Sequence, residues 1–172
     1  MKHTIVARVL DQPGVLNRVA SLFRRRAFNI ESLTVGGSEE RDYSRMTLVV
    51  DTARSPAHLV AANLRKLVPV VEVTDVTHMR TVDRDLALIR VRCEPTVRAE
   101  LASLVDIFRG RIVDVGLDTV IVEITGDLDK VNGLVELLKP RGILEMVRTG
   151  KVAMVRGTAT SGETVIEQRG AA

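Results

Sequence analysis

The segment KHTIVARVLDQPGVLNRVASLFRRRAFNIESLTV, residues 2–35, changes its hydrophobic period twice. Over residues 2–10 apolar and polar side chains alternate, which predicts a half-buried strand. From residue 15 the apolar side chains recur three and four positions apart, which predicts an amphipathic helix, and residues 29–35 predict a second strand. A strand, a helix and a strand in this order form the first half of a βαββαβ unit.

The residues that follow complete this order. Residues 44–50 predict a third strand, which joins the second through the polar loop 36–42. Ser55-Pro56 predicts the start of a second helix, with Ser55 as the N-cap and Pro56 in the first turn. Alternation over residues 70–79 predicts the fourth strand. The second helix is expected to bury Ala57, Val60, Ala61, Leu64 and Leu67.

The same order of elements then repeats. Glu94-Pro95 and Asp127 are predicted helix starts. The run Phe108-Arg109-Gly110-Arg111 echoes Phe23-Arg24-Arg25-Arg26 at the same place in the second unit, which supports two related units, although so short an echo does not establish a duplication. Strands are predicted at residues 86–93, 112–115, 119–125 and 144–155, the last interrupted by Gly150.

We therefore predict an α+β fold of two consecutive ferredoxin-like βαββαβ units, each an antiparallel four-stranded sheet with two helices on one face. The domains are expected at residues 2–79 and 84–156, joined through the polar stretch 80–85, and residues 157–172 are expected to form a flexible tail. The second strand of each unit falls at a sheet edge, and an open edge favours pairing with a second copy of the chain. We expect a homodimer.

Composition narrows the class of protein. The 172 residues are 45% hydrophobic and 27% charged with a net charge of +3, which is typical of a globular chain. A single Cys excludes an internal disulfide and a multi-cysteine metal site, and three Phe, one Tyr and no Trp disfavour a base-stacking platform. No apolar run has the length of a secretory signal or a membrane span, so we expect a cytoplasmic protein.

The turn Asp11-Gln12-Pro13-Gly14-Val15-Leu16 is a candidate amino-acid site. Pro13, expected in the first helical turn, has no N–H, so the free amide donors would begin at Gly14, and exposed amides at a helix N-terminus bind carboxylates. Asp11, or the side-chain oxygen of Asn29, could accept hydrogen bonds from an ammonium group. A branched aliphatic side chain could be surrounded by Val15, Leu16 and Ile30. On these residues alone, a plain strand-to-helix turn is the slightly better explanation.

No catalytic or metal-binding constellation is recognisable. The residues His3, His58 and His78 are scattered, and none stands in a metal-ligand or triad motif. His3 and His78 fall on neighbouring strands, but with no carboxylate predicted beside them we interpret them as surface residues. Cys93 ends an apolar strand face and is expected in the core.

Basic residues invite a nucleic-acid hypothesis. We interpret Arg24 to Arg26 as a solvated helix end that suits the helix dipole, with a phosphate or nucleic-acid patch as the alternative. RNA-recognition modules of this topology need aromatic residues on the middle strands. The matching positions here are Met46, Leu48 and Val50, which disfavours RNA binding.

The run LFRRRAFNIESLTVGGSEERDYSRMTLVV, residues 22–50, with DQPGVLNRVA before it, resembles the regulatory small subunit of acetohydroxyacid synthase, also called acetolactate synthase. In the second half, Ile107-Phe108-Arg109-Gly110 and Arg148-Thr149-Gly150-Lys151-Val152-Ala153-Met154 also resemble that family. The resemblance covers residues 2 to 157. It implies that the first unit is an ACT domain, a βαββαβ module that binds amino acids.

The resemblance also implies a site and a role. Valine, or in some members leucine or isoleucine, would bind between two ACT domains of a dimer, with the Asp11–Leu16 turn from one protomer and Asn29 with Ile30 from the other. Position 11 is often Asn in the family and is Asp here, which bears on ligand choice. A free-standing ACT sensor that acts on another protein is the alternative role.

The partner implied by the resemblance is a separate catalytic large subunit. That subunit uses thiamine diphosphate, a divalent metal such as Mg²⁺, and FAD, and condenses pyruvate with pyruvate or 2-oxobutyrate in branched-chain amino-acid synthesis. The small subunit would activate it and confer feedback inhibition. No catalytic residue, metal or cofactor is then expected in this chain.

Overall fold

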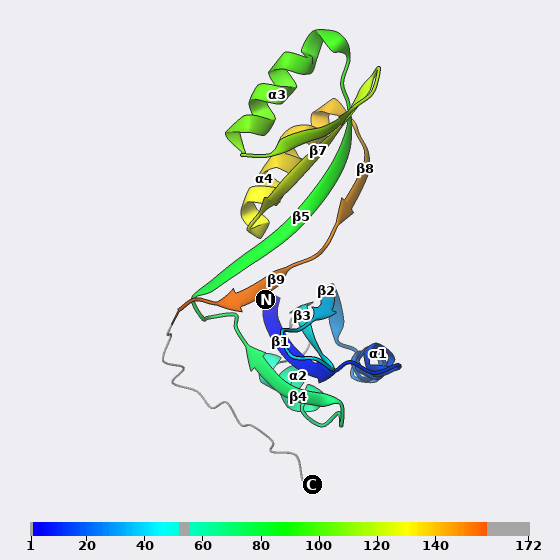
Figure 1. The fold of residues 1–172 in the computed structure, drawn as a ribbon, viewed down its shortest axis with the longest axis vertical. Coiled ribbons are helices and arrows are strands. Elements are labelled where there is room, and N and C mark those ends of the chain that lie inside the picture. Colours follow the sequence, from blue (N-terminus) through cyan, green and yellow to red (C-terminus); the bar gives the residue numbers. More distant parts are fainter. Residues whose placement is uncertain (1, 52–55, 158–172) are drawn as a thin grey trace. The chain divides into compact units, whose positions relative to one another are not determined.

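The structure is a computed structural model that describes residues 2–51 and 56–157 of the chain (Figure 1). The predicted N-cap Ser55 and the predicted tail from residue 158 onward lie outside the described residues. The chain divides into two compact units. Of the described residues, unit 1 contains those up to Val82 together with 151–157, and unit 2 contains Asp83–Gly150.

Unit 1 has the predicted βαββαβ order. Its four strands form an antiparallel sheet in the order β2-β3-β1-β4, so that β2 and β4 lie at the edges. This confirms the predicted fold class and the predicted edge position of the second strand. The elements are β1 (Lys2–Leu10), α1 (Val15–Arg25), β2 (Asn29–Gly37), β3 (Tyr43–Asp51), α2 (Ala57–Leu64) and β4 (Val70–Asp75).

The helices of unit 1 cover one face of this sheet because strand residues alternate. Ile5 on β1 lies opposite Leu48 on β3, and both are fully buried in one apolar cluster with Val19, Phe23 and Leu64 from the helices. Three further cluster members on β3 and α2 are Met46, Val50 and Val60. The β3 positions at which an RNA-recognition module would need aromatics are therefore core positions.

The opposite face of the sheet in unit 1 is covered in part by residues 152–155. Alternation over 144–155 predicts a single strand of the second domain, but the segment is divided: β8 (Ile143–Arg148) belongs to unit 2 and β9 (Val152–Val155) to unit 1. Between them Gly150 adopts a φ of 86°, a conformation that favours glycine. Ala153 is then buried against Val6 and Val76.

Hydrogen bonds fix this returning segment to unit 1. The Lys151 amide donates to Ser32 Oγ at 3.1 Å, and Arg45 Nη2 donates to the Ala153 carbonyl at 3.1 Å. The Arg156 amide donates to the Arg80 carbonyl at 2.7 Å. The segment also remains part of the second sheet, because β9 pairs with β5.

Unit 2 repeats the order, with an antiparallel β6-β7-β5-β8 arrangement and β6 at an edge. The boundary between the units, Val82/Asp83, falls in the polar stretch 80–85 where the join is predicted, and most of this stretch lies within β5. Cys93 is buried, as predicted, and Asp127 is the predicted N-cap, since its Oδ1 accepts from the Lys130 amide at 2.8 Å. The elements are β5 (Thr81–Arg92), η1 (Pro95–Val97), α3 (Arg98–Ile107), β6 (Arg111–Val115), β7 (Thr119–Gly126), α4 (Leu128–Leu138), η2 (Lys139–Arg141) and β8.

The two units have the same order of elements and also the same departures from regular strand pairing. The register of β1 against β4 shifts at Arg8/Val9, and that of β5 against β8 shifts at Arg90/Val91. At the end of the first helix the Ala27 amide donates to Arg24, and the Arg109 amide donates to Asp106. Asp106 is thus the counterpart of Arg24, so the echo between Phe23-Arg24-Arg25-Arg26 and Phe108-Arg109-Gly110-Arg111 is displaced by about one helical turn. The prediction that it occupies the same place in both units is wrong, although the units are alike.

Candidate functional site

The β1–α1 turn is built around Gly14. Gly14 is the N-cap of α1 with φ 86° and ψ −3°, a left-handed conformation for which glycine is the least strained residue. The helix begins at Val15, so Pro13 precedes it and does not occupy the predicted first turn. A Cβ built on Gly14 meets no atom within 4 Å, so the space beside this residue is open.

At the start of α1, some backbone amides donate a hydrogen bond within the protein and others do not. The Val15 amide donates to the Gln12 carbonyl at 3.3 Å, so it is not one of the free donors. Within the described part of the chain, the amides of Gly14, Leu16 and Asn17 donate to no carbonyl. The sequence hypothesis omitted Asn17, although counting the first turn from a Gly14 N-cap would have included it.

The side chains of the turn also differ in exposure. Asp11 is exposed, while its amide is anchored to the Asp42 carbonyl at 2.8 Å. Leu16 is 47% exposed, but Val15 is only 6% exposed and belongs to the core of unit 1. The side chain of Leu16 is therefore accessible to a ligand, whereas Val15 is directed into the core.

The second predicted half of the site, Asn29 and Ile30, lies at the start of β2. Strands β1 and β2 are both antiparallel to β3 and so run in the same direction, and Asn29 and Lys2 both lie opposite Asp51. Asp11 follows the other end of β1. Because a nine-residue strand spans about 30 Å, one protomer does not bring Asn29 to the Asp11 turn. Asn29 is exposed, and Ile30 packs partly on the core.

A cluster of polar side chains lies where β1 begins and β4 ends. His3 Nδ1 lies 3.0 Å from Asp75 Oδ2 and 3.2 Å from Thr77 Oγ1, and the rings of His3 and His78 are 5.9 Å apart, edge to face. The expectation of two surface histidines without a carboxylate neighbour is therefore wrong for His3, which is half-buried beside Asp75. Burial raises the pKa of Asp75, but hydrogen bonds from Thr77 and the contact with His3 outweigh it, and the pKa is lowered.

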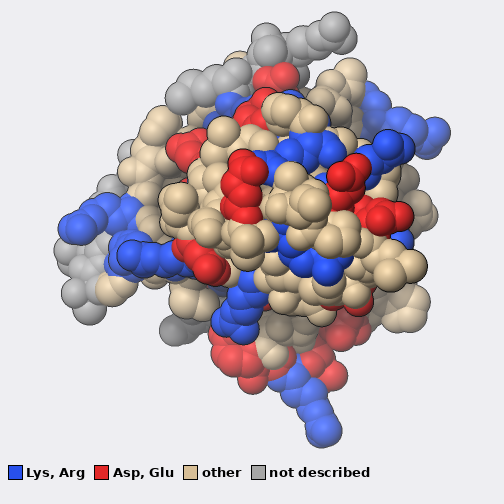
Figure 2. All heavy atoms as spheres, turned by 90° about the horizontal axis from the view of Figure 1, so that it is seen from above, with Lys and Arg blue, Asp and Glu red and all other residues tan. Residues whose placement is uncertain are grey.

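Other classes of site find little support in the described residues. No group of three or more His, Cys, Asp or Glu side chains there could hold a metal ion. None of the helices in the described ranges is long and apolar enough to cross a membrane. On the face drawn in Figure 2, basic and acidic side chains alternate with neutral ones, and neither sign dominates. Arg24, Arg25 and Arg26 are exposed, as predicted for a solvated helix end.

Comparison with known families covers both units. A model described as "AHAS small subunit-like ACT domain" matches residues 5–72, and a model described as "Small subunit of acetolactate synthase" matches residues 84–157. The chain belongs to the acetolactate synthase small subunit family. This confirms the resemblance found in the sequence, and it identifies unit 1 as an ACT domain.

Members of the acetolactate synthase small subunit family match along almost their whole length. The "Probable acetolactate synthase small subunit" of Archaeoglobus fulgidus is 53% identical over 157 residues, which are 91% of this chain and 98% of that protein. The "Acetolactate synthase small subunit" of Bacillus subtilis is 42% identical over 169 residues, 96% of this chain and 98% of that protein. The crystal structure of the small subunit from Thermotoga maritima is 40% identical, with a TM-score of 0.84, and the match covers 91% of this chain and 98% of that one.

Proposed function

We propose that this chain is the regulatory subunit of acetolactate synthase, which activates a separate catalytic large subunit and makes it sensitive to feedback inhibition by valine or another branched-chain amino acid. The observation that carries the proposal is that the two halves of the candidate site lie apart within one protomer. The open turn at Gly14 and the exposed Asn29 lie at opposite ends of the sheet in unit 1, and β2 is an open edge. The domain that senses the effector would be unit 1.

Pairing of two ACT domains through this edge would complete the site. If two copies of β2 pair antiparallel, the start of one β2 lies beside the end of the other. That end of β2, at Gly37, lies at the same end of the sheet as the Asp11 turn. The Asp11 amide donates to the Asp42 carbonyl in the loop that follows β2. Asn29 of one protomer then approaches the Gly14 turn of its partner, and neither protomer holds the ligand alone.

The chemistry of the two halves suits a free amino acid. The free amides of Gly14, Leu16 and Asn17 would bind the α-carboxylate at the N-terminus of α1. The carboxylate of Asp11, and the side-chain oxygen of Asn29 from the partner, would accept from the ammonium group. Leu16 and the partner's Ile30 would contact an aliphatic side chain.

Regulation would follow from linkage between the effector and the catalytic subunit. The amino acid favours one arrangement of the paired ACT domains, and that arrangement supports the partner's active site less well. Such coupling is reciprocal and amounts to about 1–3 kcal/mol. In this proposal the chain has no catalytic residue and no cofactor of its own, and thiamine diphosphate, Mg²⁺ and FAD are bound by the large subunit.

Reconstitution with the catalytic subunit tests the proposal. The chain should raise the rate of acetolactate formation, and valine, leucine or isoleucine titrated into the assay should then lower it. A chain that neither activates the catalytic subunit nor confers inhibition would contradict the regulatory role. Co-purification with a different protein would favour a free-standing sensor.

Gly14→Asp tests the pocket itself. A Cβ at this position meets no atom within 4 Å, and Asp is among the residues that adopt the left-handed region at modest strain, so the variant should fold. Its carboxylate should repel the ligand and raise the inhibitory valine concentration at least tenfold. Gly14→Asn has the same size without the charge and should show the smaller effect. If Gly14→Asp still activates and remains fully inhibitable, the pocket assignment is wrong.

A further inference from the structure

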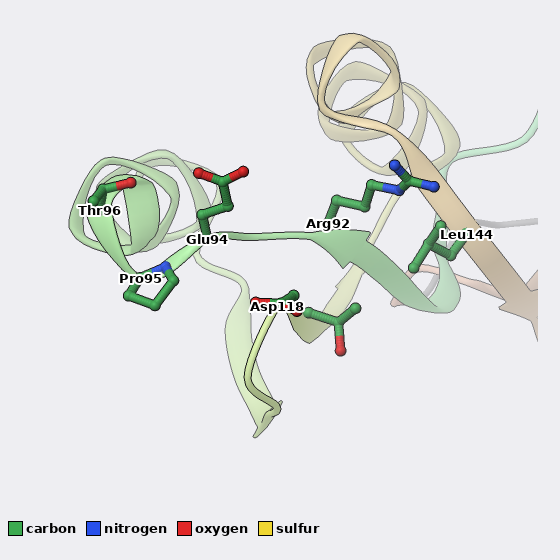
Figure 3. A pocket seen from close by; sticks show the side chains of 7 residues that line it. Arg92, Glu94, Pro95, Thr96, Asp118 and Leu144 are labelled. Atoms are coloured by element: carbon green, nitrogen blue, oxygen red, sulfur yellow. The ribbon is translucent and has the colours of Figure 1, made fainter.

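A cavity of about 650 Å³ opens in unit 2 where β5 ends (Figure 3). Arg92 and Leu144 lie on one side of the opening, and Glu94, Pro95 and Thr96 lie on the other. Asp118, just before β7, and Thr119, its first residue, complete the lining. The cavity belongs to unit 2 alone and is separate from the Gly14 turn.

The segment beside this cavity is the counterpart of the Asp11–Gly14 turn in unit 1. The Cys93 amide donates to the Asp118 carbonyl at 2.8 Å, as the Asp11 amide donates to the Asp42 carbonyl at 2.8 Å. Glu94-Pro95-Thr96 therefore takes the place of Gln12-Pro13-Gly14. The chain presents this strand-to-helix connection twice, in two different chemical forms.

The charged side chains of the cavity have no partners among the residues that the structure describes. Some other charges of unit 2 are paired: Arg148 bonds Asp85, and Arg141 bonds Glu100. In the described ranges, no hydrogen bond or ion pair engages the side chains of Arg92, Glu94 and Asp118, which line the same cavity. A cation and two carboxylates are thus free to meet a ligand.

Hydrogen bonds from α3 hold one wall of the cavity. Arg98, at the start of α3, donates through Nη2 to the Gly116 carbonyl at 3.0 Å and to the Leu117 carbonyl at 2.9 Å. These bonds tie the β6–β7 connection, and with it Asp118, to the helix. A site whose walls are already ordered loses less entropy on binding than a mobile one.

We propose that this cavity is a second binding site, specific for a small zwitterion of the α-amino acid class with an aliphatic side chain. The Arg92 guanidinium binds the carboxylate, and the carboxylates of Glu94 and Asp118 bind the ammonium group. Pro95 and Leu144 contact the aliphatic side chain. Because the cavity is lined by two carboxylates and only one guanidinium, the binding of phosphate esters and other multivalent anions is disfavoured.

The proposal is independent of the Gly14 pocket and is tested on the full chain by NMR. L-leucine is titrated into ¹⁵N-labelled protein to about 10 mM, at which a site of millimolar Kd is mostly occupied. We expect the amide signals of Thr96, Asp118 and Thr119 to shift, and to shift equally in Gly14→Asp. Arg92→Gln and Asp118→Asn should each weaken this response about tenfold.

Controls separate a specific site from a charged surface. Arg90→Gln removes a cation from the same strand that faces Glu145 and does not line the cavity, so it should leave the response unchanged. Inorganic phosphate should produce no matching shifts. The proposal is overturned if leucine shifts none of these amides, if Arg92→Gln responds like the unaltered chain, or if phosphate reproduces the response.

Discussion

At the scale of the residue, the Asp75 carboxylate at the end of β4 bonds both His3 on β1 and Thr77. Its Oδ2 lies 3.0 Å from His3 Nδ1, and its Oδ1 accepts from the Thr77 amide at 3.0 Å and from the Thr77 hydroxyl. The carboxylate therefore joins the end of β4 to the start of β1. Its lowered pKa means that the ionised form is the one that stabilises the fold.

The stability of the chain should accordingly fall in acid through Asp75. Because the folded-state pKa is below the ordinary value of about 4, this contribution is complete above that value and is lost as the pH falls through the lowered pKa. Asp75→Asn should cost about 1 kcal/mol of unfolding free energy at neutral pH and flatten the acid dependence. Urea unfolding between neutral and acidic pH measures both, with the exposed Asp11→Asn as control. Equal acid dependence in the two variants would contradict this role.

Single residues differ in how well the sequence predicts them. Asp127 is predictable as an N-cap, because capping needs only neighbours three residues away. Free amides at this turn were predicted, but with the left-handed Gly14 as N-cap the Val15 amide is used and the Asn17 amide is free. The contact between His3 and Asp75 was missed because it joins distant parts of the sequence.

At the scale of the element, hydrophobic period predicts a strand but not the core on which the strand packs. Alternation over 144–155 is equally compatible with one long strand and with two strands in different units. The left-handed Gly150 decides between them, and β9 then covers Val6, which the helices leave uncovered. The covered second face explains why Thr4, Thr47 and Val49 are buried although they point away from the helices.

Charge placed on β9 should therefore destabilise unit 1. Ala153 is 5% exposed, so Ala153→Asp would bury an unpaired carboxylate and should cost about 2–4 kcal/mol of unfolding free energy. Met154 is the next residue of the same strand and is 66% exposed, so Met154→Asp should change stability by less than about 0.5 kcal/mol. Thermal and urea unfolding of the two variants would be compared. Similar losses in both would show that β9 does not cover this face in solution.

At the scale of the whole molecule, β2 is an edge strand, as the sequence predicted, and the proposed dimer would form through this edge. The Ser38 amide donates to the Tyr43 carbonyl, and because antiparallel ladders alternate, the Val35 amide is directed away from β3. This amide is available to a second chain. The topology was predictable from periodicity alone, whereas the division of the candidate site between the two ends of the sheet depends on strand direction and register.

Val35→Pro should separate the dimer without unfolding its subunits. Proline removes the outward amide of an edge strand and leaves the bonds to β3 in place. Light scattering after gel filtration should give the mass of a dimer for the unaltered chain and for Val35→Thr, which keeps the amide. It should give the mass of a single chain for Val35→Pro. A Val35→Pro variant that remains dimeric would place the dimer interface elsewhere.

The return of residues 151–157 to unit 1 also sets an order of events during synthesis. Unit 2 is continuous in sequence, so it can fold as soon as Gly150 has left the ribosome. Unit 1 emerges first, yet its second face stays open to water until β9 has been made. The domain proposed to sense the amino acid is thus translated first and finished last, and a nascent chain arrested before Lys151 would present that uncovered face to the cell.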